Sequence, residues 1–156
     1  MMKTAVTEKL DGLGIDYKIK HHSQPVYTSE AAARERGVKL SQIVKTMLLS
    51  DRKGKLLVAV LPGDRRLSLK KLKRLAGVKD LSFLDRETIE QRLGLVAGAI
   101  APIAELFKEM PIFVDPSVFL EQTVDISSGD PCAGLELTSK DLKRLLKGCK
   151  LVDITL

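Results

Sequence analysis

Two apolar segments joined by a short polar turn constrain the fold most strongly. The first, SQIVKTMLLS at 41–50, alternates its side chains between two faces as a β-strand does. The second, LLVAVLPG at 56–63, is a continuous apolar run with the length of a buried strand. The polar residues between them include Gly54, which favours a turn. We therefore predict an antiparallel hairpin, because so short a connection cannot join parallel strands.

Helical and extended segments alternate along the rest of the chain. Apolar spacing and capping residues predict helices at 3–13, 28–37, 68–77 and 85–94, and a further helix after a strand within 134–148. Other strands are predicted at 16–22, 111–115, 123–127 and 150–156. The sequence shows neither an internal repeat nor a Pro/Ser-rich linker. We therefore predict one domain over residues 1–156, of the α/β class and α+β type, with a mixed sheet.

Composition narrows the classes of function. With 44% hydrophobic and 29% charged residues, and no apolar run near the roughly 20 residues that span a bilayer, a soluble globular protein is expected. The N-terminus lacks the features of a signal peptide, so we expect a cytoplasmic protein. Cys132 and Cys149 show no metal-ligand spacing, which predicts reduced thiols and no metal. The net charge of +6 favours an anionic partner, while the absence of tryptophan argues against base stacking on long single strands.

One lysine stands among the apolar residues of the first predicted strand. Alternation places Lys45 on an otherwise apolar face, together with Ile43, Met47 and Leu49. Burial of an ammonium group costs free energy unless the group is paired. In one interpretation, Lys45 lies on an edge strand or near a strand end and reaches water along its flexible stem. In the other, the strand fixes the ammonium in a cleft, where it attracts a phosphate or a carbonyl oxygen that is becoming negative.

Two loops are rich in small residues. The segment GLVAGAIAPIAEL at 94–106 places Gly98 four residues before Pro102, so its backbone either approaches a ligand closely or forms a tight bend. The segment DISSGDPCAG at 125–134 offers hydroxyl and N–H groups, although its composition is also typical of a plain turn. Neither loop contains the GxSxG pattern of serine hydrolases.

Basic residues concentrate between positions 65 and 74. This run either forms the solvated face of a helix or contacts an RNA backbone, which the positive net charge favours. The candidate RNA-binding residues are Arg65, Arg66, Lys70, Lys71, Lys73 and Arg74. The two histidines, His21 and His22, have no acidic or cysteine cluster nearby in the sequence, so we favour a loop role over metal binding.

Taken in order, these features resemble the YbaK-like family of prolyl-tRNA synthetase-associated editing domains. The resemblance covers nearly the whole chain and rests on the segments TSEAAARERGVKLSQIVKTMLL, VAVLPGDRRLSLKKLKRLAG, GLVAGAIAPI, ISSG and GLELTSKDLKRLL. The lysine in VKT, the Gly-x-x-x-Pro loop and the Ser-x-Gly turn occur in the family's order and approximate spacing. The fold that this resemblance implies is a mixed, barrel-like β-sheet surrounded by helices.

The resemblance also implies an activity, the hydrolysis of the ester that joins a wrong amino acid to the 3′ end of a tRNA. Lys45 would be the family's essential catalytic lysine, and no cofactor is implied. The implied substrate-binding residues are Thr46, Gly98, Ala99, Pro102, Ser127, Ser128, Gly129 and His22. The chain has no room for a synthetase catalytic core, so we expect a free-standing deacylase that acts in trans. Its expected partner is the acceptor end of a mischarged tRNA, and an aminoacyl-tRNA synthetase is a further candidate. We expect it to bind neither DNA nor a membrane.

The attacking group and the exact substrate stay open at this point. Water, the ribose hydroxyl or a substrate thiol could attack an activated ester without a Ser/His/Asp set. Many relatives carry a serine before the loop proline, a glycine after it, and a basic residue following the Ser-x-Gly turn. This chain has Ala101, Ala104 and the segment DPCAG there, so alanyl-, cysteinyl- and other small aminoacyl-tRNAs remain candidates.

The small residues around Pro102, which are Gly98, Ala99, Ala101 and Ala104, predict a shallow pocket for an amino acid no larger than proline. The resemblance implies tRNA-Pro as the carrier. A non-catalytic tRNA- or protein-binding module of the same fold is the alternative. A phosphate- or nucleotide-binding domain is a third interpretation, but the chain lacks a P-loop and a GxGxxG motif.

Overall fold

The computed structural model describes residues 2–156, and its first half is built around the predicted hairpin. Helix α1 (Ala5–Gly12), strand β1 (Lys18–His21), helix α2 (Ser29–Arg36) and the 3₁₀ turn η1 (Leu40–Gln42) come first. Strands β2 (Val44–Ser50) and β3 (Leu56–Pro62) then pair antiparallel, with Lys45 opposite Leu61. Helix α3 (Leu69–Ala76) and the short strand β4 (Ser82–Phe83) follow. The hairpin prediction is confirmed.

The second half alternates short helical turns with strands. Helix α4 (Arg86–Thr88) continues as the π-helical turn η2 (Ile89–Leu93), and the 3₁₀ turn η3 (Ala104–Phe107) comes after the Gly98 loop. Strand β5 (Ile112–Val114), the turn η4 (Pro116–Phe119), strands β6 (Thr123–Ser127) and β7 (Ala133–Thr138), helix α5 (Ser139–Leu145) and strand β8 (Lys150–Leu151) complete the fold. Each predicted helix and strand therefore has a counterpart, most of them shorter than expected.

Side-chain caps explain why several helices begin where the sequence predicts. The hydroxyl groups of Thr28 and Ser68 accept hydrogen bonds from the backbone N–H groups of Ala31 and Lys71. These bonds satisfy donors that the first helical turn leaves without partners. Helix α2 ends at Gly37, whose left-handed conformation (φ 66°) suits a residue without a Cβ.

The strands form two separate sheets. One has the order β1-β7-β6 and is antiparallel throughout, and the other has the order β4-β2-β3-β5-β8 and is mixed. A single parallel bridge between Ile43 and Asp125 connects them just before β2 begins. The α+β class with a mixed sheet is confirmed, whereas the sheets do not close into a barrel.

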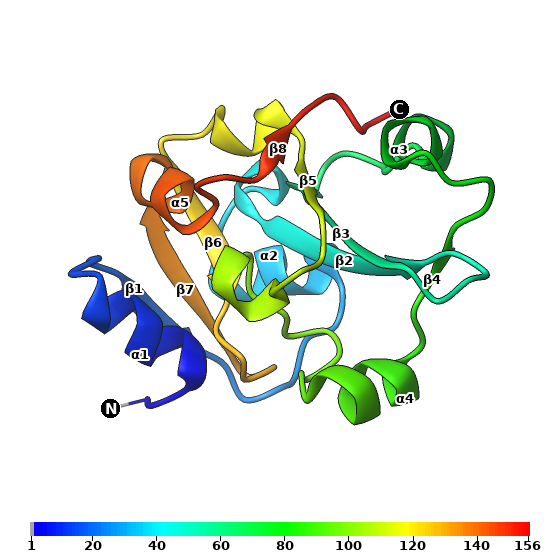
Figure 1. The fold of residues 1–156 in the computed structure, drawn as a ribbon. Helices are drawn as coiled ribbons and strands as arrows, with labels where there is room; N and C mark the ends of the chain where they lie inside the picture. The colour runs from blue at the N-terminus through cyan, green and yellow to red at the C-terminus, as the bar shows by residue number, and fades with distance from the viewer. Residues whose placement is uncertain (1) are drawn as a thin grey trace.

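The five-stranded sheet is buried on both faces. Val44, Leu48 and Val60 belong to the main core, while Leu49 and Leu57 pack in a second cluster on the other face. In Figure 1, helix α1 and strand β1 lie at the opposite side of the molecule from helix α3 and the C-terminus. Across residues 2–156, no helix combines the length and apolar character that crossing a bilayer requires.

Candidate functional site

A cavity of about 290 Å³ lies beside the first half of β2. Its wall is formed by the start of β2, the first turn of α2, the Gly98 loop and the end of β6. The residues that line it are Val26, Tyr27, Thr28, Ser29, Glu30, Ala32, Arg36, Ile43, Val44, Lys45, Thr46, Met47, Gly98, Ile100 and Ser127. Segments that are far apart in the sequence therefore meet in one concave site, as ligand-binding sites do.

Lys45 is the second residue of β2 and lines this cavity. Strand β4 pairs only with Leu49 and Ser50, so that edge of β2 carries no partner strand at Lys45. The side chain is half-buried, and burial lowers the pKa of its ammonium, with Arg66 lowering it further and the carboxylates of Glu30 and Asp64 raising it. Both interpretations of the lysine therefore hold in part, because it lies near a strand end and also faces a cleft.

The Lys45 ammonium makes no hydrogen bond or ion pair with any other residue in 2–156; only through-space charge interactions reach it. A desolvated ammonium without a fixed partner attracts an anionic or strongly polar ligand group more strongly than a solvated one. The site therefore holds a positive charge that is available to a ligand.

Three more of the predicted substrate-binding residues lie with Lys45 around the cavity. These are Thr46, Gly98 and Ser127. The Thr46 hydroxyl oxygen is buried and has no hydrogen-bond partner among residues 2–156, although unpaired buried polar groups are rare in native proteins. A polar group of a bound ligand would satisfy it.

Most of the rest of the Gly-x-x-x-Pro loop is buried in the core, and Ile100 lies both in the core and at the cavity. Ala99 and Ala101 are 4% and 1% exposed, and Pro102 is buried beside them. Ala104 packs partly buried against the main core. Of the four small residues predicted to form the pocket around Pro102, this structure places Gly98 at the cavity and the three alanines in or against the core.

Ser128 and Gly129 likewise do not line the cavity. The Ser128 hydroxyl donates to the carbonyl oxygen of Ala133 (2.7 Å) and accepts from the N–H of Asp130 (3.2 Å), which fixes the turn between β6 and β7. Gly129 packs against Thr4, whose hydroxyl donates to the Ser128 carbonyl oxygen. The interpretation of this segment as a turn holds for these two residues, while Ser127 alone projects to the site.

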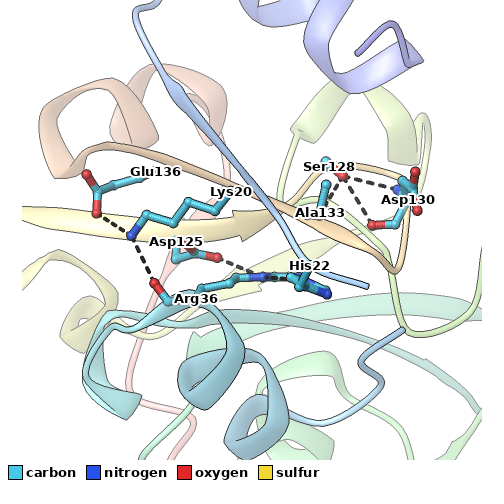
Figure 2. A network of polar contacts seen from close by, with 8 residues as sticks. All are labelled: Lys20, His22, Arg36, Asp125, Ser128, Asp130, Ala133 and Glu136. Carbon is cyan, nitrogen blue, oxygen red and sulfur yellow. Dashed lines mark hydrogen bonds and ion pairs between the residues drawn. The ribbon is translucent and has the colours of Figure 1, made fainter. Parts of the chain in front are cut away.

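His22 contacts the site indirectly, through Arg36. Its Nε2 accepts a hydrogen bond from Arg36 Nε (3.4 Å), so the proton lies on Nδ1, which donates to the Gln24 carbonyl oxygen (2.7 Å). Figure 2 shows the Arg36 side chain between His22 and Asp125. His22 thus orients a lining residue and is not itself a lining residue.

Sequence reasoning missed the ion pair between Arg36 and Asp125. Their side chains are 4% and 0% exposed, and Arg36 Nη1 lies 2.7 Å from Asp125 Oδ1. Burial raises the pKa of Asp125, and the guanidinium opposes that shift. The signal was present in TVDIS, where Asp125 is a lone charge within an apolar strand, as Lys45 is in β2.

The basic run is not a uniform surface. Arg65, Arg66, Lys70 and Arg74 are exposed, while Lys73 is half-buried. Lys71 instead binds the C-terminal segment, because its ammonium lies 2.9 Å from Asp153 Oδ2 and 2.6 Å from the Thr155 carbonyl oxygen. Of the six candidates, Lys71 is therefore already engaged within the fold.

The cavity offers charge and hydrogen-bond donors but no assembled nucleophile. No group of three or more His, Cys, Asp or Glu side chains within residues 2–156 is placed to hold a metal ion. Ser127 has no hydrogen bond to a general base in that part of the chain, unlike the serine of a catalytic triad. Such a site suits a reaction in which the protein positions a substrate and stabilises developing negative charge.

Comparison with known proteins agrees with this geometry. Residues 23–145 match the aminoacyl-tRNA editing domain family. The prolyl-tRNA editing protein ProX of Acetoanaerobium sticklandii is 31% identical over 149 residues, which cover 93% of this chain and 90% of ProX. EbsC of Enterococcus faecalis, provisionally named a Cys-tRNA(Pro)/Cys-tRNA(Cys) deacylase, is 27% identical over 81% of this chain and 76% of its own.

A solved structure shows the same fold over almost the full length. The crystal structure of the hypothetical protein APE2540 superposes with a TM-score of 0.82 at 28% identity, covering 97% of this chain and 99% of that one. Sequence and structure thus agree over the segments that form the cavity. The chain belongs to the aminoacyl-tRNA editing domain family, as a YbaK-like, prolyl-tRNA synthetase-associated editing domain.

Proposed function

We propose that this protein is a trans-acting aminoacyl-tRNA deacylase, which hydrolyses the ester between a small amino acid and the terminal ribose of a mischarged tRNA. The observation that carries the proposal is the ammonium of Lys45, which lies in the cavity of an editing-family domain and has no ion-pair partner among residues 2–156. Similarity to ProX along 90% of that protein supports action in trans.

Lys45 is the catalytic residue of this proposal. In ester hydrolysis an oxygen attacks the carbonyl carbon, the bond to the ribose oxygen breaks, and the ribose hydroxyl and the free amino acid are released. Negative charge develops on the carbonyl oxygen in the transition state, where a fixed positive charge lowers the barrier. Ser127, Thr46 and the backbone at Gly98 line the space in which the aminoacyl group would lie. The oxygen that releases the amino acid comes from water; attack by the neighbouring ribose hydroxyl would first move the ester to that hydroxyl, and water would then have to hydrolyse the new ester.

The dimensions of the cavity favour a small aminoacyl group. A volume of about 290 Å³ is at the lower end of the range for ligand sites. Its apolar lining comes from Val26, Ala32, Val44, Met47 and Ile100 instead of the small residues of the Pro102 loop. A wall of this kind discriminates by size at roughly 1–3 kcal/mol per methylene, so alanine, cysteine, serine and proline are the candidate amino acids.

The expected tRNA is the proline isoacceptor, which the name of ProX supports. The exposed basic residues of the run at 65–74 would contact the phosphates of its acceptor end, and one of them, Arg66, lies close enough to Lys45 to lower the pKa of that lysine. An aminoacyl-tRNA synthetase that supplies the mischarged product is the candidate protein partner.

A hydrolysis screen tests the proposal. Alanyl-, cysteinyl-, seryl- and prolyl-tRNA-Pro are incubated with wild-type protein and with Lys45→Met, and the remaining ester is measured under single-turnover conditions. The expected result is hydrolysis of at least one substrate by the wild type and its loss in the variant. Tight tRNA binding without hydrolysis of any substrate would instead favour the non-catalytic binding module.

A further inference from the structure

Arg36 combines deep burial with one donor group that the fold does not use. It is the last residue of α2, and its side chain is 4% exposed yet lines the cavity. Nη1 donates to Asp125 and Nε donates to His22, whereas Nη2 has no acceptor in residues 2–156. The buried polar atoms without partners in that part of the chain are Thr46 Oγ1 and Asp125 Oδ2. Nη2 is not one of these fully buried atoms and Arg36 lines the cavity, so we take Nη2 as the donor that Arg36 offers there.

The fold makes room for this guanidinium and fixes its plane. A Cβ at Gly134 would lie 2.4 Å from Arg36 Nε, so only glycine at that position of β7 lets the side chain pass. At the other end of the residue, the Lys20 ammonium donates to the Arg36 carbonyl oxygen (3.3 Å) and pairs with Glu136. Figure 2 shows Lys20 between these two groups, with Asp125 and His22 at the far end of the arginine.

Stability alone does not explain the arrangement. Replacing a buried ion pair by apolar residues of similar volume is often neutral or stabilising, so such a pair is a poor device for holding a fold together. Here the pair also leaves Asp125 Oδ2 without a partner. A guanidinium held rigidly on two sides and open on the third is instead typical of a binding group that is oriented before its ligand arrives.

Charge indicates which ligand group the open edge fits. The Asp125 carboxylate already balances the charge of Arg36, so the pair offers a directed hydrogen bond and little net positive field. Lys45 has no such counter-ion in contact within residues 2–156, so it supplies the positive field at the carbonyl oxygen, to which Arg36 can add a directed hydrogen bond. A neutral carbonyl oxygen that becomes negative during reaction fits the donor at Arg36.

We propose that Arg36 Nη2 donates a hydrogen bond to the carbonyl oxygen of the aminoacyl ester, with Asp125 and His22 as the residues that position it. This inference rests on the proposed function and adds a second substrate-binding group to Lys45. Arg36 thereby stabilises the oxyanion that forms when the ester is attacked.

The test uses the double variant Arg36→Met/Asp125→Leu, which removes both buried charges together and leaves neither without its partner. The matched control is Arg34→Met, an exposed arginine on the same helix. We expect the double variant to lose about 100-fold or more in single-turnover deacylation rate, as for other oxyanion donors. Its affinity for uncharged tRNA, which lacks the ester, should stay within about two-fold of wild type.

Two results would overturn the inference while the deacylase activity stands. A double variant with the wild-type rate would make the pair purely structural. A loss of affinity for uncharged tRNA as large as the loss of deacylation rate would mean that Arg36 binds a phosphate of the tRNA.

A second measurement covers the cases in which the double variant unfolds or the wild type hydrolyses none of the substrates. The Arg36 Nε–H resonance is followed by nuclear magnetic resonance on adding 3′-alanylamido-adenosine, a stable amide analogue of the ester, or 3′-amino-adenosine as control. A shift with the first compound only is the expected result. An unmoved resonance would reject the role of Arg36, and the hydrolysis screen separately decides the proposed function.

Discussion

The ring of Tyr27 occupies the space that a side chain at residue 98 would need. A Cβ built on Gly98 lies 2.6 Å from Tyr27 Cδ1, and Gly98 has a φ of 86°. The guanidinium of Arg86 lies 5.1 Å from the centre of the same ring. Tyr27 therefore connects the segment before α2 to the Gly98 loop and to α4 at the wall of the cavity.

Substitution of Gly98 should consequently disrupt the loop and not merely narrow the pocket. We expect Gly98→Ala to cost about 1–2 kcal/mol for its left-handed backbone and a further ~1–3 kcal/mol for the clash with Tyr27. Deacylation of all substrates should fall together. Chemical denaturation and the substrate panel measure the two effects.

Gly94→Ala is the matched control, because Gly94 has a φ of 64° but no atom within 4 Å of its Cβ position. The two variants should differ in stability by the clash with Tyr27 alone. Equal stabilities, or a loss at Gly98 confined to the largest amino acid, would show that Tyr27 yields and that Gly98 acts as a simple size filter.

Lys45→Met should separate catalysis from folding. Removal of a half-buried ammonium leaves stability unchanged or raises it, while loss of the charge should lower the single-turnover rate by at least about 100-fold. Thermal melting and deacylation of alanyl- and cysteinyl-tRNA are the measurements. Lys18→Met, which changes an exposed strand lysine, is the control. A Lys45→Met protein that unfolds, or that deacylates at the wild-type rate, would remove the lysine from the mechanism.

Lys45 should also leave a signature in the pH dependence of stability. Its pKa in the folded protein is lowered from 10.5 by burial, so the unfolded chain binds more protons between the folded and unfolded pKa values. Stability therefore rises with pH through that window. The free energy of unfolding of wild type minus that of Lys45→Met should increase from neutral pH towards pH 10.5. A flat difference would mean that the ammonium is fully hydrated in the folded state, and a falling one that Glu30 and Asp64 raise its pKa by more than burial lowers it.

The features that the sequence predicts correctly depend on residues that lie close together in the chain. The beginnings of helices α2 and α3 and the hairpin between β2 and β3 depend on residues within a few positions of one another, and they were predicted correctly. The family and the α+β class were also predicted correctly. The division into two sheets was not predicted, because the pairing of β1 with β7 joins residues such as Lys18 and Glu136 that no local pattern connects.

The candidate site shows the same division between local and long-range information. Lys45 was identified because a charge interrupts an apolar strand. Arg36 was missed because it lies in an ordinary polar helix, and only the fold brings it to Asp125. The alanines of the Gly98 loop were misplaced because small apolar residues suit a pocket wall and a core equally well in sequence.

The Arg36–Asp125 pair should show strong coupling in a double-mutant cycle. Arg36→Met alone leaves a buried carboxylate without its partner, and should cost about 3–5 kcal/mol. Arg36→Met/Asp125→Leu should recover most of that loss. Urea denaturation of the two single variants and the double variant gives the coupling free energy. Additive effects would mean that water already screens the pair.

The basic run should divide into residues that bind RNA and one that holds the fold. Neutralising Lys70, Lys73 and Arg74 should flatten the dependence of log affinity for tRNA on log salt, by roughly 0.7–0.9 for each phosphate that the protein no longer neutralises. Lys71→Met should leave that slope unchanged, because its ammonium is bound to Asp153 and the Thr155 carbonyl oxygen. It should instead lower stability by releasing the C-terminal segment. Filter binding between about 50 and 200 mM salt, with melting curves for each variant, distinguishes the two roles. An unchanged slope in the triple variant would make this helix face merely solvated, and a flattened slope in Lys71→Met would place that lysine on the RNA as well.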